Sequence, residues 1–561
     1  MEKRRPLLWA LRRTKRRLPA LVFLIIISIG QSLLNVAFAL GMKNVIDSAV
    51  SGNRDLFIRA CVIQCCVVLG LLLDNMLNRH LRDKTHAQLE RDWKKYLFHG
   101  ALHGAYADVS KYHTGELLNL FNNDTKAIND GLISIFPGLA AMVTQLVAGV
   151  IALVVMEPLL TAVILVGGVC LVFATSLIRK PLKRLQKRIS TENGKISGFL
   201  QEILEKLLMV QAMDVSEEIE KRSHTMLDRR YELERKRKNV SMVSVSCLNF
   251  LALGAGFVVL TWGSFGILNG TMGYGTLTAL IQLVNQVRIP MVNISGVLPQ
   301  YVALTASAER LMDLEEIFGE PAEPADTPQN LYARMQSINA ENMSFAYDRD
   351  PVFQQATFQI PKGEFGVIVG HSGIGKSTLL KLMLGIFKPQ KGQLFLQTEE
   401  GAITLDRTTR GLFAYVPQGN LLLSGTLRDN LTITRPDATE EEIRQAVYIS
   451  CMDDYLDALP LGLETVLGES AQGLSEGQAQ RLSIARAVLS QAPVMLLDEA
   501  TSALDPVTEQ TVLTRLRDAG KTCIAVTHRP AATQMSQWQL EVRQDGCTFH
   551  RQENEIPENR E

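Results

Sequence analysis

Residues 365–387 read FGVIVGHSGIGKSTLLKLMLGIF, and this stretch decides the fold of the C-terminal part of the chain. FGVIV predicts a buried strand, and TLLKLMLGIF predicts a helix. Between them, GHSGIGKST matches G-x-x-x-x-G-K-[ST], whose glycines let backbone N–H groups close around phosphate oxygens in front of a helix dipole. Lys376 is expected to reach the β- and γ-phosphates and Ser377 to bind Mg²⁺. The predicted nucleotide-binding residues of this loop are Gly370, His371, Ser372, Gly373, Ile374, Gly375, Lys376, Ser377 and Thr378.

A second apolar run, VMLLDE at 494–499, ends in two adjacent carboxylates. Alone, such an acidic pair at a strand end is usually a solvated turn. Beside a phosphate loop, Asp498 is expected to hold Mg²⁺, and Glu499 is expected to position or polarise the attacking water. Together the two stretches predict nucleotide hydrolysis.

The stretch QGLSEGQAQRLSIARA, residues 472–487, begins like a capped helix. Ser475 precedes an apolar-periodic run and Gln478 follows three residues later, which is the spacing of a capping box. Two glycines and Arg481 at such a helix start raise a second possibility. The same residues can form half of a binding site.

The N-terminal part of the chain has the composition of a membrane domain. The chain has 561 residues, with 58 Lys+Arg against 58 Asp+Glu, so no global basic surface predicts a nucleic-acid partner. Long apolar stretches lie near 19–42, 57–79, 132–155, 158–178, 244–268 and 274–303. Most have the roughly twenty residues that cross a bilayer, and five uninterrupted runs argue against buried helices of a soluble protein.

The connections between these stretches predict their orientation. Those around 43–56, 156–157 and 269–273 are short, whereas 80–131 and 179–243 are long and charged. Positive charge beside spans stays on the cytoplasmic side, so the long loops and the basic N-terminus are predicted to be cytoplasmic. The long loops lack Pro/Gly clusters and are predicted to continue the spans as helices.

The composition changes again near 316–335, a Pro-containing linker. Beyond it, short β-rich runs alternate with helical stretches, which is typical of an α/β domain with a largely parallel sheet. The predicted fold is therefore a six-span helical transmembrane domain with long cytoplasmic extensions, followed by an α/β nucleotide-binding domain. Its expected boundaries are 1–315 for the membrane domain, 336–550 for the α/β domain and 551–561 for a polar tail.

The sixth apolar stretch contains polar side chains that are candidates for a substrate path. Gln282, Gln286 and Asn293 recur on one helical face, with Arg288 on a neighbouring face. Polar residues within a span tend to face a bundle interior or a water-filled cavity. The alternative is that they satisfy one another in helix packing.

At this point the chain closely resembles the ATP-binding cassette (ABC) transporters, specifically exporter-type half-transporters, over nearly its whole length. LSEGQ at 474–478 resembles the family signature LSGGQ and precedes Asp498 by the family's spacing. YHTGELLNLFNNDTKAI at 112–128 and MVQAMDVSEEIEK at 209–221 resemble the exporters' intracellular loops. The resemblance implies ATP-binding roles for Leu474, Ser475, Glu476, Gly477 and Gln478.

The resemblance also implies roles for residues whose chemistry alone is ordinary. Tyr347 in SFAY would stack on adenine, and Gln418 in YVPQ would sense Mg²⁺ and the membrane domain. Asp505 in SALD would contact ATP through the D-loop, and His528 in VTHR would act at the γ-phosphate. LGES, near Gly468 and Glu469, resembles the loop that touches the coupling helices.

In such a transporter the signature helix of one chain completes the ATP site of another. The resemblance therefore implies a dimer, either of copies or of two different chains, which moves amphipathic small molecules, lipids or peptides by alternating access. ATP and Mg²⁺ are the implied cofactors, and a bacterial plasma membrane with a cytoplasmic ATP-binding domain is the expected location. A siderophore or metal-complex importer of the same architecture, and a non-pumping ATP-gated regulator, remain alternatives.

Three departures from the family pattern stand out. Glu476 occupies a signature position where glycine is commonest. The tail after His528 is short and degenerate. No peptidase-like domain precedes the first span, so processing of a peptide leader is not expected.

Overall fold

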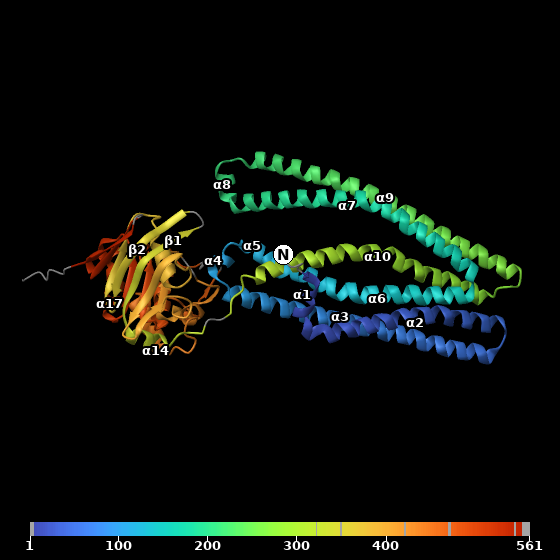
Figure 1. Cartoon of the computed structure of the whole chain (residues 1–561), viewed down its shortest axis with the longest axis horizontal. Helices are drawn as coiled ribbons and strands as arrows, with labels where there is room; N and C mark the ends of the chain where they lie inside the picture. The colour runs from blue at the N-terminus through green and yellow to red at the C-terminus, as the bar shows by residue number, and fades with distance from the viewer. Residues whose placement is uncertain are drawn as a thin grey trace, which may run out of the picture. The chain divides into compact units, whose positions relative to one another are not determined.

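We describe the protein from a computed structural model, shown in Figure 1. The structure describes residues 5–320, 323–347, 350–419, 422–468, 473–543 and 546–552. The chain divides into two compact units. The helical unit comprises Met1–His99 and His113–Glu316, and the sheet unit comprises Gly100–Tyr112 and Ile317–Glu561.

The helical unit consists of long helices joined by tight turns, as its long apolar and periodic stretches predict. Its elements are α1 (Pro6–Arg13), a 3₁₀ turn (Lys15–Arg17), α2 (Leu18–Val50), α3 (Arg54–His103), α5 (Thr114–Asn119), a π-helical turn (Leu120–Asp124), α6 (Thr125–Met156), α7 (Pro158–Glu205), α8 (Leu207–Ala212), α9 (Ser216–Leu268) and α10 (Tyr274–Glu315). Each of the six predicted apolar stretches falls within one long helix.

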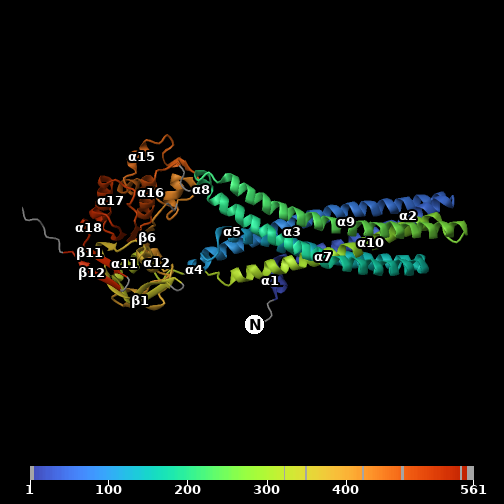
Figure 2. The ribbon, with the colours of Figure 1, turned by 90° about the horizontal axis from the view of Figure 1, so that it is seen from above.

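Close approach between helices depends on small residues in this unit. A Cβ added to Gly131 of α6 would lie 2.9 Å from Leu304 Cβ of α10, and one added to Gly149 would lie 2.8 Å from Val287 Cγ2. Such glycines let helix backbones pack closely where hydrophobic burial alone gives little drive. In Figures 1 and 2, α7 and α9 run side by side and are joined at one end by α8.

Within the part of the chain that the structure describes, three helical segments are long and apolar enough to cross a membrane: Lys15–Val50, Arg54–His103 and Thr114–Met156. Shorter apolar stretches, Pro158–Gly167 and Leu253–Leu268, lie in α7 and α9. The side chains of 168–180, within the fourth predicted span, lie outside the described residues. α10 holds the sixth predicted stretch, whose polar residues reduce its apolar character.

The sheet unit is an α/β domain, as predicted. Its strands are β1 (Met335–Tyr347), β2 (Asp350–Pro361), β3 (Phe365–Val369), β4 (Lys391–Thr398), β5 (Gly401–Thr404), β6 (Phe413–Val416), β7 (Gly425–Thr426), β8 (Val466–Leu467), β9 (Val494–Asp498), β10 (Thr522–Val526), β11 (Trp538–Arg543) and β12 (Gly546–Arg551). Its helices are α4 (Tyr106–Val109), α11 (Pro328–Arg334), α12 (Lys376–Met383), α13 (Leu427–Thr432), α14 (Glu440–Ile449), α15 (Asp453–Asp457), α16 (Glu476–Leu489), α17 (Pro506–Asp518) and α18 (Pro530–Met535), with 3₁₀ turns at Arg410–Leu412 and Gly462–Glu464.

The main sheet has the order β12-β11-β3-β10-β9-β6, and its strands from β11 to β6 are parallel. An antiparallel sheet of order β2-β1-β4-β5 packs against it through a shared apolar core. Strands β3, β9 and β10 end in register, because Val526 pairs with both Ile368 and Asp498. The loops that follow these three strands therefore leave the sheet at one edge, which is where parallel α/β sheets bind ligands.

The segment Gly100–Tyr112 belongs to the sheet unit, although it follows a membrane-domain helix in the sequence. The Tyr106 ring meets the Phe387 ring edge-on at 6.1 Å between centroids. The Arg407 guanidinium donates to the His103 carbonyl at 2.8 Å. No sequence pattern predicted this assignment.

Candidate ATP-binding site

The phosphate loop connects the buried strand β3 to the N-terminus of α12. Gly370, Gly373 and Gly375 have φ values of 150°, 79° and 111°, a range that strongly favours glycine. A Cβ on Gly375 would also lie 2.3 Å from Val352 Cγ1, and one on Gly370 would lie 2.6 Å from the Val542 carbonyl oxygen. At Gly370 and Gly375, both the backbone conformation and the lack of space therefore disfavour any residue with a side chain. His371 and Ser372 are exposed at the loop, and Ile374 packs on the core.

Lys376 is the first residue of α12, and its ammonium group turns back into the loop. It is 5 % exposed and donates to the carbonyls of Gly370 at 2.8 Å and His371 at 3.0 Å. Burial lowers the pKa of Lys376, and the nearby carboxylates of Glu499 and Asp498 oppose that shift. The arrangement places a cation under the loop that would surround phosphate.

Ser377 and Asp498 meet at the end of the sheet, as the sequence predicts. The Ser377 hydroxyl donates to Asp498 Oδ1 at 2.8 Å, and the Tyr415 hydroxyl donates to Asp498 Oδ2 at 3.0 Å. Asp498 is 2 % exposed. Burial and the adjacent Asp498 raise the pKa of Tyr415, so this phenol stays protonated and keeps donating. A hydroxyl and a carboxylate in contact are hard oxygen ligands of the kind Mg²⁺ prefers.

Glu499 follows directly, in a sharp turn. Its φ is 50°, uncommon for a residue with a side chain, and its N–H donates to the Val526 carbonyl at 3.0 Å. Non-glycine residues in this conformation concentrate at functional sites. The Gln418 amide donates to the Glu499 carboxylate at 2.7 Å. Gln418, which the family resemblance singled out, therefore meets the candidate catalytic carboxylate.

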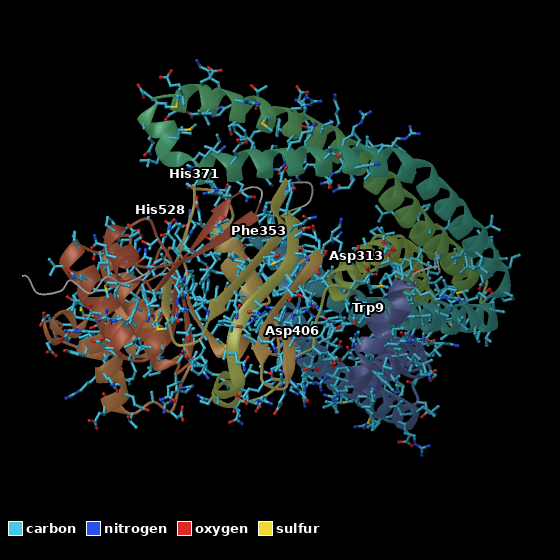
Figure 3. All side chains as sticks on the ribbon, turned by 60° about the vertical axis from the view of Figure 1, so that its left-hand side comes forward. Trp9, Asp313, Phe353, His371, Asp406 and His528 are labelled. Atoms are coloured by element: carbon cyan, nitrogen blue, oxygen red, sulfur yellow. The ribbon has the colours of Figure 1, made fainter. Side chains whose placement is uncertain are left out.

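His528 and His371 lie in loops that leave adjacent parallel strands, β10 and β3, at the same edge of the sheet (Figure 3). His528 is exposed. The predicted γ-phosphate residue is thus accessible at the edge that carries the phosphate loop.

Tyr347 ends β1 beside the first turn of α12. Its hydroxyl shares a hydrogen bond of 3.2 Å with the Thr378 hydroxyl. Phe345 and Phe387 meet its ring edge-on, with centroids 5.0 and 5.3 Å away. The ring is 41 % exposed, so an aromatic surface beside the phosphate loop remains accessible.

The signature stretch starts α16 with the predicted capping box. The Ser475 hydroxyl accepts from the Gln478 N–H at 3.3 Å, and the Gln478 side chain accepts from the Ser475 N–H at 2.8 Å. Glu476 is exposed at the first helical position, and Leu474 packs on a neighbouring apolar cluster. A Cβ on Gly477 would lie 3.0 Å from the Ala503 carbonyl oxygen, so this position faces the D-loop closely.

The structure does not join the signature to the phosphate loop of the same chain. Among the described residues, no hydrogen bond links 474–478 with 370–378. Asp505 acts here as the cap of α17, accepting from the N–H groups of Val507 at 3.2 Å and Thr508 at 3.0 Å. Glu469, from the predicted coupling-helix loop, lies outside the described residues.

Several functional contacts were missed by sequence reasoning. Buried Gln480 links the signature helix to the D-loop, donating to the Ser502 hydroxyl at 2.9 Å and accepting from the Ala503 N–H at 3.0 Å. Arg529, next to His528, donates to the Leu504 carbonyl and to the buried Glu509 carboxylate. Their only sequence signal is proximity to a motif.

The four predicted substrate-path residues lie on α10. The Gln286 amide donates to the Asn35 carbonyl of α2 at 2.8 Å, which is a helix-packing contact. Gln282 Oε1 and Arg288 Nε are buried without a partner among the described residues, and Asn293 is exposed. None of the four lines either of the two pockets described in the helical unit.

Comparison with known proteins assigns a family to the helical part of the chain and to the α/β part. The family model "ABC transporter transmembrane region" matches residues 21–291, and the family model "ABC transporter" matches residues 353–502. A probable ABC transporter ATP-binding/permease protein of Haemophilus influenzae is 28% identical over 465 residues, covering 80% of this chain and 79% of that protein.

Relatives with named cargo are also similar. The mitochondrial iron-sulfur clusters transporter ATM1 of Kluyveromyces lactis is 33% identical over 50% of this chain, but the match spans only 40% of that protein. An ATP-dependent lipid A-core flippase of Desulfotalea psychrophila is 30% identical over 62% of this chain and 61% of its own length. The structure of a bacterial Atm1-family ABC exporter with ATP bound has the same fold, with a TM-score of 0.75 and 21% identity over 95% of this chain and 94% of that one.

Proposed function

This chain belongs to the ATP-binding cassette transporters, integral membrane proteins that couple ATP hydrolysis to transport, and we propose that it exports an amphipathic molecule as a dimer. The observation that carries the proposal is the cluster at the end of the parallel sheet. There Ser377 contacts Asp498 and Gln418 contacts Glu499, while the Lys376 ammonium group is bonded to the phosphate-loop carbonyls beside them. A carboxylate in the position of Glu499 serves ATP hydrolysis, and binding of the nucleotide alone would not need it.

Each residue of the cluster has a role that its chemistry supports. Lys376, now bonded to loop carbonyls, would turn to the phosphate oxygens of ATP. The Ser377 hydroxyl and Asp498 carboxylate would hold Mg²⁺, which when bound neutralises phosphate charge. Glu499 would accept a hydrogen bond from the attacking water once Gln418 releases it. His528 would contact the γ-phosphate, and Tyr347 would offer its exposed ring to adenine.

The dimer follows from the signature helix. The capping box satisfies the N–H groups of Ser475 and Gln478, which leaves those of Glu476 and Gly477 pointing out of the helix N-terminus. Such a terminus binds anions. Since it makes no hydrogen bond to the phosphate loop of its own chain within the described residues, we assign it, with Leu474 and Asp505, to the ATP site of a second chain.

The turn around α8 supports the same assembly. Leu208, Met209 and Met213 are exposed, with Leu208 at 83 %. An apolar turn at the end of two long helices suits coverage by another protein surface. We propose that the ATP-binding domain of the second chain covers it.

Direction and location rest on the relatives and on charge. The named relatives include a flippase and an exporter, which favours export over the importer alternative. The basic N-terminus and the long charged loops support a cytoplasmic ATP-binding domain, because positive charge beside membrane spans stays on the cytoplasmic side, and we propose a bacterial plasma membrane as the location. We propose that the membrane domain spans 1–315, the linker 316–335, the ATP-binding domain 336–550 and the polar tail 551–561. The polar residues of α10 are proposed to form part of the substrate path.

The test is ATP hydrolysis by the purified full chain in lipid. Glu499→Gln should abolish hydrolysis while ATP still binds, because the amide cannot orient the water as the carboxylate does. Glu441→Gln, at an exposed position of α14, is the matched control and should hydrolyse ATP like the wild type. Equal hydrolysis by Glu499→Gln and wild type would reject the proposed role, and an inactive wild type would favour the regulator alternative.

A further inference from the structure

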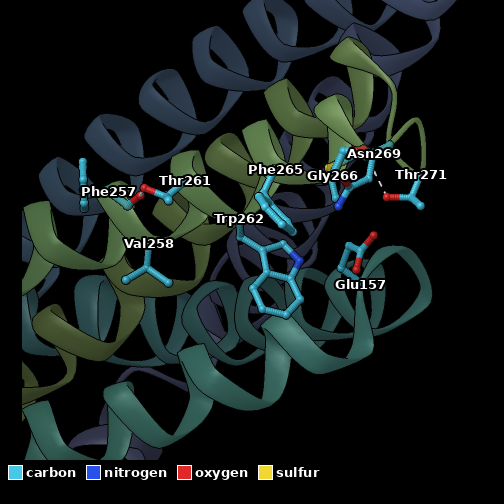
Figure 4. Close-up of a pocket in the computed structure, with 10 residues that line it drawn as sticks. Glu157, Phe257, Val258, Thr261, Trp262, Phe265, Gly266, Asn269 and Thr271 are labelled. Atoms are coloured by element: carbon cyan, nitrogen blue, oxygen red, sulfur yellow. Dashed lines mark hydrogen bonds between the residues drawn. The ribbon is translucent and has the colours of Figure 1, made fainter.

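A pocket in the helical unit has the composition of a cation site. It lies where α6 meets α7 and where α9 turns into α10, and its volume is about 730 Å³, within the usual range for small-molecule sites. Phe257, Trp262 and Phe265 of α9 supply aromatic walls. Glu157, between α6 and α7, supplies a carboxylate (Figure 4).

The charge of the pocket has one sign. Among the residues that the structure describes, its lining includes Glu157 and no lysine or arginine. Glu157 is the N-cap residue of α7, yet its side chain makes no capping hydrogen bond. Its backbone is nevertheless fixed, because its N–H donates to the Leu153 carbonyl at 2.8 Å and its carbonyl accepts from the Thr161 hydroxyl at 2.7 Å. The main chain thus fixes the position of the residue, and the helix cap does not use its carboxylate.

The aromatic walls match that charge. Aromatic faces attract cations, most strongly at tryptophan, and they also bury apolar groups. Trp262 is 38 % exposed and Phe265 is 65 % exposed, so the other residues of this chain leave both rings partly uncovered on the pocket side. Figure 4 shows the Trp262 ring and the Glu157 side chain lining the same space. An apolar molecule without charge would leave the carboxylate unpaired, and an anion would be repelled by it.

We propose that this pocket binds an amphipathic organic cation, with its charge at Glu157 and its apolar body against Trp262 and Phe265. Both connections beside the pocket are the short ones, opposite the cytoplasmic loops. The site therefore lies on the non-cytoplasmic side, where an exported molecule leaves. This assignment rests on the proposed export function and names its substrate class.

The test is equilibrium binding to the purified full chain in detergent. Tetraphenylphosphonium is the probe, and tetraphenylborate is its anionic counterpart of similar size and shape. Wild type should bind the phosphonium and discriminate against the borate. Glu157→Gln should weaken phosphonium binding about tenfold, as expected for loss of one attraction between opposite charges that do not touch, without weakening borate binding.

Two further variants complete the design. Trp262→Leu should also weaken phosphonium binding, whereas Asp55→Asn, at the start of α3, removes another exposed carboxylate and should not. Equal binding of the two probes by wild type, or unchanged phosphonium binding in Glu157→Gln, overturns the proposal. So does a changed oligomeric state in Glu157→Gln, because a second copy would then occupy the pocket. Basal ATP hydrolysis is measured on the same samples to distinguish failure of this inference from failure of the proposed function. A wild type that hydrolyses ATP but does not bind the cation rejects only this inference. A wild type that does not hydrolyse ATP rejects the transport function.

Discussion

Tyr415 gives a sharp test of the Mg²⁺ site, because its hydroxyl holds one oxygen of Asp498 at 3.0 Å while Ser377 holds the other at 2.8 Å. Tyr415→Phe keeps the ring and removes only that donor. Asp498 is 2 % exposed, so water does not readily replace the lost hydrogen bond. Groups that orient metal ligands typically contribute about 10–100-fold in metal affinity or activity when they are removed.

The assay is ATP hydrolysis as a function of free Mg²⁺ at fixed ATP. We expect the half-saturating Mg²⁺ concentration to rise by about tenfold or more in Tyr415→Phe. Binding of a fluorescent ATP analogue in EDTA should stay unchanged, because the phosphate loop and Lys376 are intact. Tyr455→Phe, packed on an apolar cluster away from Asp498, is the control.

An unchanged Mg²⁺ dependence in Tyr415→Phe would refute the role assigned to its hydroxyl. Equal loss of analogue binding with and without Mg²⁺ would also refute it, because the defect would then lie in the phosphate loop and not in the metal site.

Three other perturbations have defined outcomes. Arg529→Met removes the ion pair of 3.1 Å to Glu509, whose side chain is 2 % exposed. The free energy of unfolding should fall by about 3 kcal/mol, because a buried carboxylate loses its cation. A thermal-unfolding midpoint equal to that of the wild type would contradict this. Burial lowers the pKa of Lys376, so its ammonium group loses its charge at a lower pH than a free lysine, whose pKa is about 10.4. As the pH rises, ATP affinity should therefore begin to fall below that value. Lys376→Arg, which keeps its charge, should remove this fall. Gln286→Leu breaks the contact to Asn35 and should alter substrate-stimulated ATP hydrolysis; unchanged basal and stimulated rates would exclude Gln286 from the substrate path.

Local sequence predicted the parts of the ATP site that short motifs specify. The glycine spacing, the apolar strand before Asp498 and the capping box at Ser475 each depend on neighbouring residues only, and the six apolar stretches each fall within one helix. These features could be predicted because period and turn chemistry are local properties.

The contacts that were missed connect residues far apart in sequence. Tyr415 reaches Asp498 across 83 positions, and Gln480 reaches Ser502 across 22. The assignment of Gly100–Tyr112 to the sheet unit depends on Phe387 and Arg407, about three hundred residues later. Hydropathy and helical period carry no information about such pairs, because only the folded chain brings them together.

The central claim is that one chain's signature helix completes the ATP site of another. The most direct measurement is disulfide cross-linking of a full-length chain whose eight native cysteines are replaced and which carries Ser372→Cys, Ser475→Cys and Glu499→Gln. Both serines are exposed, one in the phosphate loop and one at the signature helix. We predict a covalent dimer that forms with ATP and not without it, and that is absent from either single-cysteine chain under mild oxidation. A cross-link confined within one chain, or one indifferent to ATP, would contradict the account.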